Sequence, residues 1–199
     1  MKKHLIAAAF LALAASSSMA AVITFDSVAI GGAGLAVVEN FEEAGFSVSG
    51  PLATIGSQFP GAYAGSAALF LANPGNVATL AKVDGGTFSL KAIDLSPLAP
   101  SWYGGGASIT FTGNVHGGAT LTQSFTVGAD LGFTTYQFTG FDKLDSVTWM
   151  QASPFHQFDN IVVAESAAES AAVPEPGTLA LFGVALAGIG ALRRKAFKA

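Results

Sequence analysis

The chain has 199 residues, a formal net charge of −4 at pH 7 and no cysteine. The absence of thiols excludes disulfides, thiol catalysis and cysteine-ligated metals. Residues 21–172 carry three lysines, no arginine and twelve acidic residues, which gives this part a net charge of −9. Nucleic-acid binding is excluded, because no basic patch is available to neutralise a phosphate backbone.

The chain starts with the pattern of a secretory signal peptide. Two lysines precede an apolar run at residues 5–15, and a run of small residues ends at Ala20. Because Ser18 and Ala20 are small enough for a signal peptidase, we predict a signal peptide over residues 1–20, cleaved after Ala20. The alternative is an uncleaved anchor, but the apolar run is shorter than the ~20 residues of a spanning helix.

The next part, residues 21–163, is long enough for one domain with a single core. Short runs rich in Thr and Phe alternate polar and apolar residues there, and turn residues separate them. The clearest runs are residues 87–90, 108–112, 120–127, 133–138, 146–150 and 158–163. Many short strands with turns between them predict an all-β fold, an antiparallel two-sheet sandwich of the jelly-roll type. Only residues 34–43 and 67–71 leave room for a helical turn.

Aromatic residues in two loops are candidate ligand contacts. Trp102 and Tyr103 lie between Pro100 and a triple glycine, and Tyr63 lies in a second loop rich in Gly and Ala. Aromatic faces stack on the apolar C–H faces of sugar rings, so these three aromatic residues are candidate sugar contacts. Alternatively, Trp102 folds back and closes one end of the sandwich. Trp149 follows the alternation of a strand and is expected in the core.

No catalytic motif is present in this domain. Its only histidines are His116 and His156, and no Gly-x-Ser-x-Gly elbow accompanies them. Acidic residues 39, 42 and 43 could supply a carboxylate pair for glycoside cleavage, but their close spacing is typical of a solvated segment. Residues 31–34 lack the Lys-Ser/Thr of a phosphate loop. We therefore predict a non-enzymatic protein, with a secreted hydrolase as the second alternative.

The chain ends with a segment suited to a membrane. Residues 164–172, rich in Ala, Ser and Glu, predict a linker. An uncharged apolar run at residues 179–192 then predicts a transmembrane helix of about 21 Å against a bilayer core of about 30 Å. Arg193, Arg194 and Lys195 follow it as a basic stop, which stays cytoplasmic and leaves the domain outside.

A short polar motif precedes the apolar run, with the residues Pro174, Glu175, Pro176 and Gly177. Its two prolines fix φ and lack an amide hydrogen, so the motif should be extended, with Glu175 as a charged recognition group. Together with the apolar run and the basic stop, the segment at residues 173–199 resembles the PEP-CTERM sorting signal of Gram-negative bacteria.

The PEP-CTERM resemblance implies a processing partner and a destination. An exosortase, which is a membrane enzyme, recognises the Pro-Glu-Pro region and replaces the tail. The protein is then an inner-membrane intermediate before it reaches the cell surface or the extracellular matrix. A plain anchor that keeps its tail is the alternative. The same motif also has an ice-binding C-terminal label, but residues 21–163 contain no regular Thr-x-Thr repeat, and we do not predict ice binding.

The domain itself has a second resemblance. Its short stretches at residues 23–26, 45–46, 86–95 and 158–163 follow one another as in exported PEP-CTERM domains related to carbohydrate-binding jelly rolls. In those modules, acidic groups on the first and last strands hold a structural Ca²⁺, which implies a calcium site at Asp26 and Asp159. Carboxylate oxygens suit such a hard cation. The alternative is that Asp159 marks a bulge or a strand entry and that Asp26 caps a turn.

These features predict an exported, non-enzymatic surface or matrix protein associated with exopolysaccharide. The alternative is a calcium-stabilised glycan-binding module that uses Trp102 and Tyr103.

Overall fold

The computed structural model describes residues 20–165. The predicted signal peptide before Ala20, the linker beyond Glu165, the sorting motif and the helix at residues 179–192 lie outside the described residues. Within residues 20–165, no helix is long and apolar enough to cross a membrane. In chain order the elements are β1 (Ala20–Ile23), the 3-10 turn η1 (Asp26–Val28), β2 (Leu35–Glu43), β3 (Phe46–Ile55), β4 (Leu69–Leu71), β5 (Val77–Lys82), β6 (Phe88–Pro97), α1 (Pro100–Tyr103), β7 (Ser108–Val115), β8 (Thr120–Thr126), β9 (Thr134–Gln137), β10 (Leu144–Met150) and β11 (His156–Glu165).

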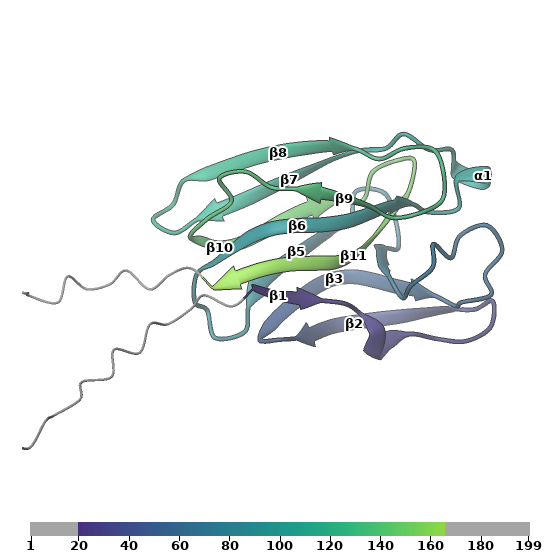
Figure 1. Ribbon diagram of the computed structural model, residues 1–199, viewed down its shortest axis with the longest axis horizontal. Coiled ribbons are helices and arrows are strands. Elements are labelled where there is room, and N and C mark those ends of the chain that lie inside the picture. Colours follow the sequence, from purple (N-terminus) through teal and green to yellow (C-terminus); the bar gives the residue numbers. More distant parts are fainter. Residues whose placement is uncertain (1–19, 166–199) are drawn as a thin grey trace, which may run out of the picture. The chain divides into compact units, whose positions relative to one another are not determined.

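Six of these strands form a closed ring of hydrogen-bonded neighbours. The order is β10, β5, β3, β4, β11 and β6, and the ring closes where Leu144 of β10 lies opposite Phe88 of β6. The other strands extend outward: β7 and β8 from β10, β9 from β6, β1 from β11 and β2 from β3 (Figure 1). The prediction of an antiparallel all-β fold is confirmed. The strand pairing forms one continuous network, however, and does not divide the fold into two separate sheets.

The backbone of β3 explains why two sheets do not separate. Residues 46–49 of β3 pair with β5, and residues 52–54 pair with β4. Between them, Gly50 has a φ of 135°, and Pro51 has no amide hydrogen to donate. A side chain at Gly50 would place its Cβ 2.5 Å from the carbonyl oxygen of Val77. The strand therefore changes neighbours at a point where only glycine fits.

The two segments that left room for a helical turn are strands. Residues 34–43 contain β2, in which the buried residues Val38 and Phe41 are three positions apart. A register shift between Val38 and Asn40 moves the alternation by one residue, which explains a spacing that also suits a helix. Residues 67–71 contain β4, whose three residues are all buried.

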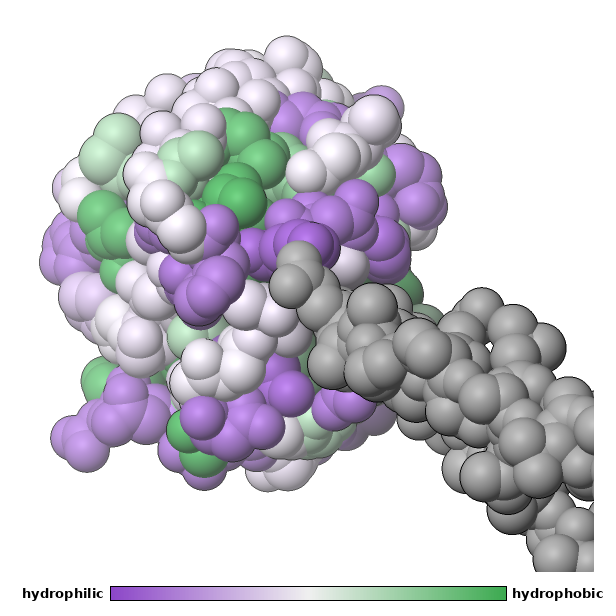
Figure 2. Space-filling view, turned by 90° about the vertical axis from the view of Figure 1, so that its left-hand side faces the viewer, coloured by the Kyte–Doolittle hydropathy of each residue, from purple (hydrophilic) through white to green (hydrophobic). Residues whose placement is uncertain are grey.

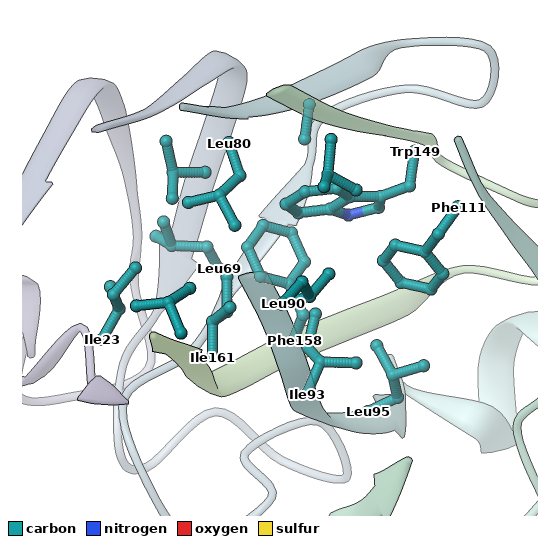
Figure 3. Packing of buried hydrophobic residues seen from close by; sticks show 14 of the residues in the cluster. Ile23, Leu69, Leu80, Leu90, Ile93, Leu95, Phe111, Trp149, Phe158 and Ile161 are labelled. Atoms are coloured by element: carbon teal, nitrogen blue, oxygen red, sulfur yellow. The ribbon is translucent and has the colours of Figure 1, made fainter. Parts of the chain in front are cut away.

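The core is built around aromatic side chains. Trp149 is 2% exposed and packs against Phe111, with ring centroids 5.4 Å apart, and against Phe158, with centroids 5.0 Å apart (Figure 3). Trp149 is thus a core residue, as predicted. Each such side chain contributes about 1.5–3 kcal/mol through burial, so the domain is stabilised without disulfides.

The first and last strands lie side by side, as expected for this fold class. Ala20 of β1 is paired with Ala164 of β11, and Ile23 is paired with Ile161. Cleavage after Ala20 would remove one residue of β1 and leave the other three paired. Both ends of the described chain lie on the left of Figure 1, and α1 lies on the right. Figure 2 looks at the end on the left, where hydrophilic residues alternate with neutral and hydrophobic ones.

Candidate functional site

A pocket of about 160 Å³ lies at the α1 end of the domain. It lies over a second apolar cluster, separate from the main core. Strand ends and loops contribute to it: the start of β2, the end of β3, the loop between β3 and β4, α1 and the residue before β11. The lining residues are Leu35, Ile55, Phe59, Ala62, Phe70, Ala72, Leu98, Ala99, Trp102, Tyr103 and Phe155.

A single helical turn presents the two predicted aromatic residues. Pro100 suits the first helical position, because its φ is fixed and it has no amide hydrogen to satisfy. The amides of Trp102 and Tyr103 both donate to the carbonyl of Ala99, at 2.9 and 3.1 Å. Gly104, with a φ of 77°, then ends the turn. Two consecutive aromatic side chains are thereby held on one short helical turn.

The aromatic pair is exposed but not isolated. Trp102 is 60% exposed and Tyr103 is 51% exposed. The Trp102 ring contacts Phe59 edge-on, with centroids 5.7 Å apart, and Tyr103 lies 4.8 Å from Phe155 at a tilt of 32°. Trp102 does not fold back into the core. Tyr63 packs partly buried against the second cluster and does not line the pocket.

The glycine-rich segment at residues 31–34 supports the loop that carries Phe59. Gly56 donates to the carbonyl of Gly34 at 2.9 Å, and the amide of Gln58 donates to the carbonyl of Gly32 at 2.8 Å. A Cβ at Gly56 would lie 2.2 Å from the Gly32 oxygen. This close approach gives the glycines a packing role.

A third carboxylate, Asp94, lies beside the predicted pair of Asp26 and Asp159. Asp159 of β11 lies opposite Asp94 of β6, and the side chain of Asn160 joins them by donating to Asp94 Oδ2 at 2.9 Å and to Asp159 Oδ2 at 3.4 Å. Ser66 also donates to Asp159 Oδ2, and the amide of Asn160 donates to Oδ1 at 2.7 Å. Asp26, in η1, is close enough for its charge to act on Asp159.

Asp159 is only 1% exposed. Burial, together with the charges of Asp94 and Asp26, raises the pKa of Asp159 to about 6. The hydrogen bonds from Ser66 and Asn160 oppose this shift. With a pKa of about 6, the carboxyl group is mostly charged at pH 7 and becomes protonated as the pH falls toward 5.

The fit of this cluster to Ca²⁺ is limited. Among residues 20–165, no three His, Cys, Asp or Glu side chains form a group that could hold a metal ion. Both oxygens of Asp159 already accept hydrogen bonds from the protein. The register of β11 also shifts between Asp159 and Val162, which agrees with the structural role of a bulge. The calcium site stays a prediction.

The two histidines lie in different surroundings. His116 Nδ1 lies 2.9 Å from Asp145 Oδ1 at the surface. His156 is fully buried, and burial lowers the pKa of its imidazole to about 4. Gln151 Nε2 donates to His156 Nδ1 at 3.2 Å, which leaves the ring proton on Nε2. His156 therefore acts as a neutral structural residue.

Sequence reasoning missed Phe59, Phe155 and Asp94. Phe59 precedes Pro60, and Phe155 follows Pro154, so each aromatic residue has a neighbouring proline in a loop, as in the Pro100 segment. This shared pattern could have identified them. Asp94 carries a different signal, since it is a single acidic residue within the otherwise apolar stretch at residues 92–95.

Comparison with known proteins confirms the sorting signal. The model of the PEP-CTERM protein-sorting motif matches residues 172–195. The motif indicates an exported protein that is anchored in the membrane during sorting, and it implies processing by an exosortase. No curated protein matches the chain.

Solved structures similar to the chain include several carbohydrate-binding modules. A mutant of the family 29 module CBM29-2 is 12% identical, and the match covers 79% of this chain and 100% of that chain with a TM-score of 0.43. TmCBM61, in complex with β-1,4-galactotriose, is 12% identical, with coverage of 61% and 89% and a TM-score of 0.39. CBM29_1 from Piromyces equi is 15% identical, with coverage of 68% and 93% and a TM-score of 0.37. The similarity concerns the fold alone.

Proposed function

We propose that the protein is a non-enzymatic surface or extracellular-matrix protein that binds an extracellular polysaccharide through its aromatic pocket. The observation that carries this proposal is the exposed pair of Trp102 and Tyr103 at the edge of a preformed pocket. Large aromatic side chains that are exposed together on one turn are typical of a binding surface. Their apolar faces suit the C–H faces of sugar rings.

The location of the pocket agrees with this role. Phe155 lines the pocket immediately before β11, and β11 leads to Glu165, from which the chain continues toward the sorting motif. Ten residues of extended strand separate the two points by about 30 Å. Within the described domain, the pocket therefore lies at the opposite end from Glu165, where the chain leaves the domain. In the proposed orientation, the domain lies outside the membrane and residues 193–195 are cytoplasmic.

Co-sedimentation with the polysaccharide of the producing cells tests the proposal. The full chain in detergent should bind, and Trp102→Ala should weaken binding about tenfold or more, because a central aromatic side chain contributes about 2 kcal/mol. Met150→Ala is the matched control, since Met150 is 54% exposed and does not line the pocket. It should bind like the parent chain. Equal binding by the Trp102 variant would overturn the proposal, and a parent chain that binds no polysaccharide would leave only a structural matrix role.

A further inference from the structure

The side chains of the pocket are poorly suited to a fully hydroxylated sugar. None of the lining residues is charged, and none has an amide or carboxyl side chain. Only Trp102 and Tyr103 carry a side-chain N–H or O–H group, and both lie at the exposed edge. Sugar hydroxyls placed against the apolar lining would lose their water without gaining hydrogen bonds from these side chains. The lining side chains therefore favour a group that is mainly apolar, and any further hydrogen bonds would come from backbone atoms of the pocket.

The size of the pocket limits what can enter. Its volume of about 160 Å³ is close to the ~150 Å³ of an apolar protein cavity that binds one benzene molecule. Pockets that enclose drug-sized ligands are larger, at about 300–1,000 Å³. A polysaccharide chain cannot enter such a space. One substituent, or the edge of one ring, can enter it while the rest of the glycan stays outside.

The polar groups at the edge favour a substituent with an acceptor oxygen. The Trp102 indole N–H can only donate a hydrogen bond, and the Tyr103 hydroxyl can donate one. A methyl group next to a carbonyl oxygen matches an apolar interior with donors at its edge. An acetyl group, as an ester or an amide, has this structure.

The charge of the domain selects against acidic glycans. Residues 21–172 have a net charge of −9, and the pocket contains no cation to offset it. A polymer of uronic acids would be repelled by this field. On the basis of the proposed glycan binding, we infer that the pocket takes the acetyl group of a neutral, acetylated sugar residue, whose ring lies on Trp102 and Tyr103.

Calorimetric titration with two disaccharides tests the inference. The probes are N,N′-diacetylchitobiose and cellobiose, which share the β-1,4 linkage and differ in the acetamido group. The full chain in detergent should bind the acetylated disaccharide at least about tenfold more tightly. Equal affinities would overturn the acetyl inference and leave the proposed glycan binding intact. Failure of both disaccharides to bind would overturn the acetyl inference, while the co-sedimentation experiment decides the proposed glycan binding separately.

A variant that fills the pocket supplies the second test. Ala72 lines the pocket and is exposed, so Ala72→Leu adds volume without displacing the core. The variant should lose the preference for the acetylated disaccharide, because the added side chain occupies the volume that the acetyl group would take. A preference that survives in Ala72→Leu would place the acetyl group elsewhere and overturn the inference. Thermal melting of the variant verifies that it is folded.

Discussion

Asp159 and His156 should give the domain an unusual dependence of stability on pH. The pKa of Asp159 is raised from 3.8 to about 6, and that of His156 is lowered from 6.5 to about 4. Between pH 3.8 and about pH 6, folded Asp159 keeps a proton that the unfolded chain has lost, so its contribution to stability falls as pH rises. Folded His156 lacks a proton that the unfolded chain binds, so its contribution rises with pH.

The two contributions are similar in size and opposite in sign. Each shift of about two pKa units corresponds to about 3 kcal/mol at 1.36 kcal/mol per unit. Asp84 and Asp142, whose pKa values are lowered from 3.8 by hydrogen bonds from the Gly86 amide and from Lys91, titrate below this range. The free energy of unfolding of the parent chain should therefore stay nearly constant from about pH 4 to about pH 6.

Two variants separate the contributions. Asp159→Asn removes the contribution that falls with pH, so the free energy of unfolding of the variant should rise by about 2 kcal/mol between about pH 4 and about pH 6. His156→Gln removes the rising term, and its stability should fall by a similar amount. The quantity to compare is the change of the free energy of unfolding with pH, because each substitution also alters packing and therefore the absolute stability. Urea denaturation at several pH values in calcium-free buffer measures it. A parent chain with a steep slope, or variants with the slope of the parent, would refute the reasoning.

Three further predictions concern the loop, calcium and the tail. Gly56→Ala should destabilise the domain by about 1–3 kcal/mol in urea denaturation, because its Cβ meets the Gly32 carbonyl; Gly31→Ala, with open space around it, should not. If calcium binds, it should raise the melting temperature, and Asp159→Ala should abolish the increment; a melting curve insensitive to EDTA would contradict the site. Mass spectrometry of the mature protein should find a C-terminus near the Pro-Glu-Pro motif, and an intact Ala199 would indicate permanent anchorage.

Alternation of polar and apolar residues predicted most strands because side chains on a strand point to opposite faces. The runs at residues 108–112 and 146–150 became parts of β7 and β10 for this reason. Alternation carries no information about which strands pair. The contact of Leu144 with Phe88, which closes the ring, joins residues far apart in the sequence. The all-β class was therefore predictable, and the closed ring was not.

The candidate site was predictable in part for a similar reason. Trp102 and Tyr103 were identified locally, from a proline and glycines around an aromatic pair. Phe59 and Phe155 join them because strands β3, β6 and β11 begin or end at the same end of the domain. Asp94 reaches Asp159 through the register of β6 and β11, which no local pattern contains.

The position of a bound glycan tests the account most directly. The chain has two tryptophans, so a nitrogen-15 spectrum of the full chain contains two indole N–H signals, which a Trp102→Phe variant assigns. Addition of oligosaccharides from the producing cells should shift the Trp102 signal and leave that of the buried Trp149 in place. A saturating oligosaccharide that leaves the Trp102 signal unmoved would contradict glycan binding at the aromatic pocket.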